Sequence, residues 1–251
     1  MKIGLDIGGS KITGVVFDGK KSVKELTIKT PNNLEDFKYS LKNLVEFLGK
    51  GKKISGLGIG MAGHMDAKRK LAVASPNIKF VKNVSFKKIF SKMRRLELEN
   101  DARCFALAEA RLGQGGKYKT LAGVTLGTGI GCGLISRGHV YRGLHGGAGE
   151  IGHMIADFNQ TFEHYFQKAR SENNYRDIGK IVGVLLINIS RSIDPEAIIL
   201  GGSVAQNAGN KFLPASMALM SQNLKSYAEP KVFISKLKHA GALGAALLLE
   251  K

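Results

Sequence analysis

Asp6-Ile7-Gly8-Gly9-Ser10-Lys11 decides the fold, because it places a glycine turn between two strand-like runs near the start of the chain. The runs on either side, Lys2–Asp6 and Ile12–Phe17, are rich in apolar and β-branched residues, which are typical of strands. Asp18-Gly19 is a hairpin signal that leads into a further run at Ser22–Ile28. The sequence therefore predicts that the chain opens with three antiparallel strands.

The rest of the first half alternates helices with strands. Apolar residues at helical spacing over Leu34–Leu48 predict a helix that ends at Gly49, and residues Ile54–Gly60 indicate a buried strand. A strand at Leu96–Glu99 is predicted to run directly into a helix at Ala102–Leu112.

The second half repeats this opening. The runs Thr120–Leu126 and Gly131–Ser136 flank a second glycine turn, Gly127-Thr128-Gly129-Ile130-Gly131, and a further strand is predicted at His139–Tyr141. The remaining predicted elements are a helix at Ile178–Ser192, a strand at Ala197–Leu200, a helix at Lys211–Leu224, a strand at Lys231–Ile234 and a terminal helix from Gly241. Two halves that begin alike predict a duplicated α/β unit with a cleft between the copies.

The glycine-rich stretch Gly113–Gly116 has the composition of a hinge or a domain boundary. We therefore expect an N-terminal domain of residues 1–115 and a C-terminal domain of residues 116–240. The terminal helix at 241–251 is expected to pack back on the first domain.

The composition is that of an ordinary globular protein, with 251 residues, 43% hydrophobic and 23% charged. No apolar run reaches the roughly 18 residues that a membrane-spanning helix needs. Met1-Lys2 leads into a strand instead of a signal-peptide core, so we expect a cytoplasmic protein with no membrane contact. Cys104 and Cys132 are the only cysteines, too few for a disulfide framework or a multi-cysteine zinc site.

The net charge of +18 attracts polyanions. Its basic clusters fall mostly in the first half: Lys50/Lys52/Lys53, Lys68-Arg69-Lys70, Lys87-Lys88 and Lys92/Arg94/Arg95. No nucleic-acid module accompanies them, so a nucleic acid is not the expected partner. A lysine-rich solvated surface is one interpretation, and attraction of a polyphosphate is the alternative.

The two glycine turns are suited to phosphate, because consecutive N–H groups without a Cβ nearby form a nest for anions. Gly8, Gly9 and the residues from Gly127 to Gly131 fit this role. One such turn is weak evidence, since tight hairpins also need glycine, but two in one chain favour phosphate binding. Asp6 leads the first turn and is suited to hold Mg²⁺ through water; its alternative is a turn-capping role.

Asn100-Asp101 stands where the predicted strand enters its helix. A carboxylate there is a helix cap or a base that accepts a hydroxyl proton during phosphoryl transfer, and the Asn100 amide is suited to fix the acceptor. Spacing alone does not decide between these roles.

Two further clusters are rich in glycine. Glu150 and His153 are three apart and share a face in any helical turn, and the glycines around them leave room for a small polar ligand. After the buried strand, Gly201-Gly202 is suited to a nucleotide base or ribose, or is a tight connection.

Together these segments resemble the ROK family of sugar kinases, the bacterial-type glucokinases and their relatives. The resemblance rests on Asp6 to Lys11, Ser75-Pro76-Asn77, Glu99-Asn100-Asp101, Leu126 to Gly131, His145 to His153 and Leu200-Gly201-Gly202. It implies the actin-like ATPase (ribonuclease H-like) fold, a sugar and phosphate site in the first domain, and a nucleotide site in the second.

The resemblance also implies ATP and Mg²⁺ as cofactors and Asp101 as the base on a sugar hydroxyl. It implies that the sugar contacts Gly63, Asn77, Asn100, Asp101, Glu150 and His153. It implies that the nucleotide and its metal contact Asp6, Gly8, Gly9, Ser10, Lys11, Gly127, Thr128, Gly129, Gly131, Gly201 and Gly202.

The chain departs from the family pattern after His153, where cysteines of a structural zinc site are replaced by Met154 to Glu163. We therefore expect no structural zinc. Glu163 stands where the pattern has a sugar-contacting glutamate. The helical region that follows is shorter than in typical members, which leaves a homodimer open.

We expect an ATP-dependent kinase that phosphorylates a hexose hydroxyl. An amino-sugar kinase, a fructose kinase and a non-catalytic sugar-binding ROK protein are the alternatives. The retained Asp101 and both glycine turns argue against the non-catalytic alternative.

Overall fold

The computed structural model describes residues 1–66, 68–225 and 227–250. The chain divides into two compact units, which we call unit 1 (Met1–Ala108 with Leu237–Lys251) and unit 2 (Glu109–Lys236). The first division lies inside helix α3 (Asp101–Leu112). The glycine-rich stretch Gly113–Gly116 follows this helix and belongs to unit 2.

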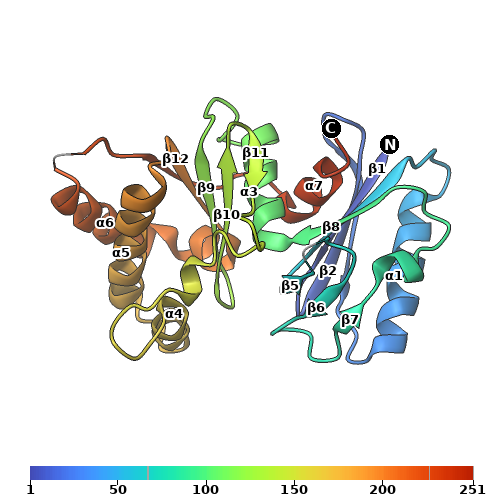
Figure 1. Cartoon of the computed structure of the whole chain (residues 1–251), viewed down its shortest axis with the longest axis horizontal. Coiled ribbons are helices and arrows are strands. Elements are labelled where there is room, and N and C mark those ends of the chain that lie inside the picture. The colour runs from blue at the N-terminus through green and yellow to red at the C-terminus, as the bar shows by residue number, and fades with distance from the viewer. Residues whose placement is uncertain (67, 226, 251) are drawn as a thin grey trace. The chain divides into compact units, whose positions relative to one another are not determined.

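Unit 1 is built on a five-stranded sheet, in which Figure 1 labels β1, β2 and β8. The order of its strands is β3-β2-β1-β4-β8. The first three strands pair antiparallel, as the hairpin signals predicted, whereas β4 and β8 extend the sheet in parallel with β1. The bounds are Lys2–Ile7 for β1, Lys11–Phe17 for β2, Ser22–Lys29 for β3, Gly56–Met61 for β4 and Leu96–Asn100 for β8.

Two helices cover opposite faces of this sheet, α1 (Leu34–Gly49) and α7 (Ala240–Leu247). A Cβ added to Gly4 would lie 1.9 Å from the carbonyl oxygen of Ala242 in α7, whereas a Cβ added to Gly14 would meet leucines of α1. Gly14 pairs with Leu5, and neighbouring residues of a strand point to opposite faces. The sheet is therefore buried on both sides.

A small antiparallel sheet and a short helix fill the segment between β4 and β8, which the sequence analysis did not predict. These elements are β5 (His64–Met65), β6 (Ala72–Ala74), β7 (Lys82–Val84) and α2 (Phe86–Ile89). Strands of two or three residues are too short to show an alternating pattern. Val84, Phe86 and Ile89 join the core of unit 1 and fix the segment to it.

Unit 2 repeats the arrangement in a sheet with the order β11-β10-β9-β12-β13. Here β9, β10 and β11 pair antiparallel, and β12 and β13 lie parallel to β9. The bounds are Leu121–Leu126 for β9, Ile130–Ser136 for β10, His139–Tyr141 for β11, Ala197–Gly201 for β12 and Lys231–Ile234 for β13. The predicted duplication of an α/β unit is confirmed.

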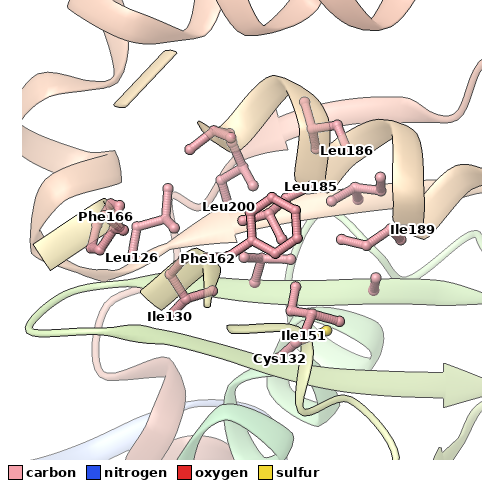
Figure 2. Packing of buried hydrophobic residues seen from close by; sticks show 14 of the residues in the cluster. Leu126, Ile130, Cys132, Ile151, Phe162, Phe166, Leu185, Leu186, Ile189 and Leu200 are labelled. Carbon is pink, nitrogen blue, oxygen red and sulfur yellow. The ribbon is translucent and has the colours of Figure 1, made fainter. Parts of the chain in front are cut away.

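The core of unit 2 lies between this sheet and its helices, and Figure 2 shows part of it. Leu126 and Ile130 from the sheet meet Phe162, Leu185 and Leu200 there. The helical elements of the unit are η1 (Ile151–His153), α4 (Phe162–Ser171), α5 (Tyr175–Ile193) and α6 (Gly202–Asn223). Phe162 opens α4, so this core fixes the start of a helix that the sequence analysis did not predict.

The helix predicted at Lys211–Leu224 begins earlier, at Gly202. The intervening residues include two asparagines and a glycine, which are weak helix formers. Ala205, Ala208 and Gly209 are buried, so packing forms these turns against local propensity. Gly201-Gly202 is consequently a tight strand-to-helix connection, which the sequence analysis left open as an alternative.

A buried carboxyl joins the two ends of unit 2. Glu109 has no exposed surface; its Oε1 accepts a hydrogen bond from the Ser235 hydroxyl at 2.5 Å, and its Oε2 accepts one from the Gln114 N–H at 3.2 Å. Burial raises the pKa of Glu109 above its usual value, although both hydrogen bonds oppose the shift. The first and last residues of the unit therefore lie side by side.

Polar side chains interrupt even the 22-residue α6. Within the described residues, no helix combines the length and apolar composition needed to cross a membrane.

Candidate functional site

The parallel strands of unit 1 bring several candidate residues to one edge of the sheet. Asp6 pairs with Gly60 and Gly60 with Glu99, while the next row pairs Met61 with Asn100. Parallel strands end at the same edge, where ligands of α/β sheets commonly bind. This edge therefore carries Asp6 and the Asn100-Asp101 pair.

The first glycine turn closes between β1 and β2. The Gly8 N–H donates to the Lys11 carbonyl oxygen at 3.0 Å, and the Thr30 hydroxyl donates to the Gly8 carbonyl oxygen at 2.7 Å. Within the described residues, the N–H groups of Gly9 and Ser10 make no hydrogen bond. Asp6 and Lys11 lie in the flanking strands, so the turn itself is Gly8-Gly9-Ser10.

Asn77 lies directly against this turn. A Cβ added to Gly9 would be 2.7 Å from the Asn77 Cβ and 2.8 Å from its carbonyl oxygen. Gly63 is equally confined, with φ of +132° and the Ala74 carbonyl oxygen 2.2 Å from the position of an added Cβ. The glycines thus let the segment that carries Asn77 approach the turn.

The carboxylate of Asp6 lies against the start of α7, where a Cβ added to Gly241 would be 2.4 Å from its Oδ2. Burial raises the pKa of Asp6 to about 7, and the nearby charge of Asp101 adds to the shift, while Lys11 opposes it. The two neighbouring carboxylates of Asp6 and Asp101 form an oxygen donor set that fits a divalent cation such as Mg²⁺.

Asn100 caps helix α3. Its Oδ1 accepts hydrogen bonds from the N–H groups of Ala102 at 3.0 Å and Arg103 at 3.3 Å, and its Nδ2 donates to the Gly63 carbonyl oxygen at 3.4 Å. Asp101 Oδ1 also accepts from the Ala102 N–H, at 2.9 Å. Because Asn100 already caps the helix, capping does not require Asp101.

The sequence analysis quoted Glu99 as part of a motif but assigned it no role. It is fully buried, and its Oε1 lies 3.3 Å from Arg103 Nη1 and accepts the Asn100 N–H at 3.0 Å. Its Oε2 lies 3.9 Å from Arg69 Nε. Glu99 lies in strand β8 and Arg103 in helix α3. A spacing of four residues predicts an ion pair only within one helix, so the sequence did not indicate this pair. Glu99 fixes the backbone that presents Asp101.

The second glycine turn follows β9 in unit 2. The Gly127 N–H donates to the Gly129 carbonyl oxygen at 3.0 Å, and within the described residues the N–H groups of Thr128 and Gly129 make no hydrogen bond. The Ile130 N–H is engaged by Glu163 Oε2 at 3.1 Å. Gly131 belongs to β10, opposite Thr125.

Gly201 and Gly202 lie beside this turn. Gly201 pairs with Thr125 near the end of β9, and Gly202 has φ of +83° with the Leu126 carbonyl oxygen 2.4 Å from the position of an added Cβ. The amino end of α6 is thus held beside the turn. Helix amino termini favour anions, because their N–H groups and dipole face outward.

Glu150, His153 and Glu163 are brought together around Gly152. Glu150 Oε2 lies 3.9 Å from His153 Nε2, and both side chains are partly exposed. A Cβ added to Gly152 would lie 2.7 Å from the Ile130 carbonyl oxygen and 3.3 Å from Glu163 Oε2. The three predicted sugar contacts in unit 2 therefore lie around Gly152.

Hydrogen bonds hold the loop after His153. Asp157 Oδ1 accepts from the N–H groups of Asn159 and Gln160, each at 2.9 Å, and Oδ2 accepts from the Tyr165 hydroxyl. The Tyr165 hydrogen bond contributes most to lowering the pKa of Asp157. Among the described residues, no three His, Cys, Asp or Glu side chains are grouped to hold a metal ion.

Comparison with known proteins agrees with these observations. The model of the ROK family matches residues 2–165 and 159–251. N-acetyl-D-glucosamine kinase of Haemophilus influenzae (strain 86-028NP) is 27% identical over 99% of both chains.

Solved structures are similar over the whole length. A ROK hexokinase from Thermus thermophilus has a TM-score of 0.87 and 28% identity, covering 98% of this chain and 96% of its own. An inorganic polyphosphate/ATP-glucomannokinase from Arthrobacter sp. strain KM has a TM-score of 0.77 and 25% identity, covering 98% and 97%. The chain has the actin-like ATPase fold, as its sequence predicted. Since the family model spans nearly every residue, this chain is a member of the ROK family.

Proposed function

We propose that this protein is an ATP-dependent sugar kinase that phosphorylates a hexose hydroxyl with Asp101 as the general base. The observation that carries the proposal is the shared sheet edge of unit 1, which holds Asp6, the first glycine turn and Asn100-Asp101. The sugar kinases among its full-length relatives support the same class of reaction.

In the proposed reaction the sugar hydroxyl oxygen attacks the γ-phosphorus of ATP. The new bond joins this oxygen to phosphorus, the bond from phosphorus to the bridging oxygen of ADP breaks, and the hydroxyl proton passes to the Asp101 carboxylate. Asn100 is committed to the helix cap and to Gly63 through one amide hydrogen, which leaves its second amide hydrogen for a sugar oxygen. The N–H groups of Gly9 and Ser10, which make no hydrogen bond to the part of the chain that the structure describes, are suited to phosphate oxygens.

Asp6 would hold Mg²⁺ through water. The bound ion would neutralise charge on the phosphate oxygens as the phosphoryl group moves. Asp6 itself would orient the water shell, and its position against Gly241 keeps the carboxylate fixed. Asp6 and Asp101 are two neighbouring carboxylates, and among the described residues they are not part of a group of three metal-ligating side chains, which suits a cation that retains water and phosphate ligands.

In unit 2, Glu150, His153 and Glu163 would bind further sugar hydroxyls. Thr128, Gly129 and the junction at Gly201-Gly202 would bind the nucleotide. Gly63 and Asn77 would line the acceptor side in unit 1, where both approach the elements already described. An amino sugar is the second candidate acceptor, because a full-length relative is an N-acetyl-D-glucosamine kinase.

A second donor, polyphosphate, is favoured by the distribution of charge. Residues 62–95 contain ten lysines and arginines and one acidic residue. The net charge of this segment, ten minus one or +9, is half of the net charge of +18 of the chain. Within the described residues, only Arg69 of these ten forms an ion pair. The phenylalanines of the segment are buried (Phe86, Phe90) or only partly exposed (Phe80), which is a poor platform for base stacking, so its lysines suit a phosphate polymer better than a nucleic acid.

The test is a panel of sugars and donors. Purified protein with Mg²⁺ is incubated with D-glucose, N-acetyl-D-glucosamine, D-mannose or D-fructose and with ATP or polyphosphate, and phosphosugars are measured by mass spectrometry. We expect turnover with ATP on a hexose or amino sugar. Absence of phosphosugar with every pair would reject a sugar kinase. Turnover with polyphosphate that falls steeply with salt would support the second donor, and no such turnover would reject it.

A further inference from the structure

The second glycine turn is held by a carboxylate. Glu163 Oε2 accepts a hydrogen bond from the Ile130 N–H at 3.1 Å, and Oε1 accepts one from Gln167 Nε2 at 3.0 Å. A Cβ added to Gly129 would lie 2.7 Å from both Cδ and Oε2 of Glu163. The side chain therefore lies directly on the backbone of the turn.

The hydrophobic core fixes both partners of this contact. Ile130 in the strand after the turn and Phe162, which precedes Glu163, are buried in one cluster (Figure 2). Thr161 caps helix α4 by accepting the His164 N–H at 3.2 Å, which sets where the helix begins. The carboxylate consequently reaches the turn from a defined direction.

A carboxylate in this position opposes phosphate in two ways. It occupies the Ile130 N–H, one of the donors that an anion-binding turn offers. It also places a negative charge beside the remaining N–H groups, and repulsion between like charges is stronger at a partly buried site than in bulk water. A nucleotide phosphate at this turn therefore gains when the carboxylate moves away or loses its charge.

We propose that Glu163 is a sugar-responsive gate on the second glycine turn. The inference rests on the proposed function, in which a sugar hydroxyl binds Glu163. Sugar hydroxyls donate to the same carboxylate oxygens that hold Ile130 and Gln167, so bound sugar draws Glu163 from the turn. The turn then offers the Ile130 N–H to phosphate. Nucleotide is thus held weakly until a sugar is present.

The experiment measures the affinity of the Mg²⁺ complex of AMPPNP by isothermal titration calorimetry, with and without saturating D-glucose or N-acetyl-D-glucosamine. In the wild-type protein we expect sugar to raise the affinity by about five-fold or more, the usual range of coupling between sites. The Glu163→Gln variant keeps a carbonyl acceptor but removes the charge. Its affinity without sugar should rise above that of the sugar-free wild-type protein, toward the value that the wild-type protein reaches with sugar, because the charge is removed while the Ile130 N–H keeps an acceptor.

Two further variants fix the interpretation. Glu172→Gln removes the same charge from the exposed end of α4 and should behave as the wild-type protein. Gln167→Glu adds a negative charge beside Glu163 and should weaken sugar-free AMPPNP binding. The expected change in sugar-free AMPPNP affinity is therefore opposite to that of Glu163→Gln. Thermal melting shows whether each variant is folded, and Gln167→Glu tests the gate even if Glu163→Gln does not fold.

A folded Glu163→Gln protein with unchanged or weaker sugar-free AMPPNP binding would overturn the gate. So would Gln167→Glu binding AMPPNP as tightly as the wild-type protein does. Sugar phosphorylation by the same wild-type preparation is measured in parallel. Normal phosphorylation with either of these results rejects the gate alone, whereas absence of phosphosugar rejects the proposed function.

Discussion

Asp101 and Asn100 are neighbours in the sequence, but they have different roles at the start of α3. Asn100 caps α3 through two N–H groups, one of which, the N–H of Ala102, Asp101 also accepts. Because Asn100 is unchanged in Asp101→Asn, the variant should keep the helix cap and lose the proton acceptor. We expect turnover to fall by about 10²–10⁴-fold, the usual contribution of a general base, with sugar affinity retained.

Turnover by the coupled assay and sugar affinity by calorimetry check this expectation. Asp194→Asn is the matched control, because Asp194 is exposed and has a left-handed φ of 49° that asparagine also adopts. A folded Asp101→Asn enzyme that turns over as fast as this control would remove Asp101 from the role of base.

Asp6 predicts how stability depends on pH and Mg²⁺. Its pKa of about 7 lies above the usual value, so the folded protein binds this proton more tightly than the unfolded chain. Without Mg²⁺, stability should fall as pH rises from about 4 to 7. Asp6→Asn should make stability depend less on pH in this range. MgATP should raise the melting temperature of the wild-type protein most near pH 7, where Asp6 loses its proton. Thermal melts across pH, with and without MgATP, measure both effects.

The candidate residues that sequence could supply were those in short local motifs. Asp6, the glycine turns, Asn100-Asp101 and the pair Glu150 and His153 each stand out within a few residues. The contact of Glu163 with Ile130 spans 33 positions, and no local pattern announces it. Likewise, Asn77 reaches Gly9 only through the packing of a segment with very short strands.

At the scale of elements, α7 depends on missing side chains in the sheet below it. Gly4 and Gly58 are paired neighbours in β1 and β4, and a Cβ added to Gly58 would lie 1.7 Å from the Ala245 carbonyl oxygen. The atoms that this Cβ would meet belong to the backbone of α7, which cannot move aside as the end of a flexible side chain can. Gly58→Ala should lower the free energy of unfolding by about 1–3 kcal/mol or more, the usual cost of overpacking.

Urea unfolding followed by circular dichroism measures this loss. Gly116→Ala is the control, because its Cβ would meet its nearest neighbour, the Gly113 carbonyl oxygen, at an ordinary 3.6 Å. If Gly58→Ala were as stable as this control, α7 would not be held as closely to the sheet as described.

Elements were predictable where pattern and burial agreed. The three opening strands, α1 and the strands β9, β10 and β12 carry runs long enough to show their period. The early turns of α6 were missed because asparagine and glycine there oppose a helix that burial imposes. Helix α4 was missed because its polar face, with Lys168 and Arg170, dilutes three buried apolar positions.

At the scale of the whole molecule, Glu109 makes the stability of unit 2 sensitive to pH. Burial raises its pKa, so the folded protein retains this proton where the unfolded chain has lost it. Stability should therefore be greatest below the usual glutamate pKa of 4.5 and should fall as pH rises toward the folded pKa. Glu109→Gln should remove this fall and preserve an acceptor for the Ser235 hydroxyl.

Chemical denaturation at several pH values compares the variant with the wild-type protein. Glu229→Gln is the control, since Glu229 is exposed in the same unit. An equal pH dependence in the Glu109→Gln and control proteins would mean that folding does not raise the pKa of Glu109.

The hydrogen bond between Glu109 and Ser235 also bears on how the chain is strung. Unit 1 is interrupted after residue 108 and resumed at 237, and the intervening 109–236 begins and ends at this one contact. Unit 2 is thus inserted into unit 1 as one continuous segment whose two ends lie next to each other. Such a layout lets a closely related segment be exchanged through two neighbouring splice points while both cores stay whole.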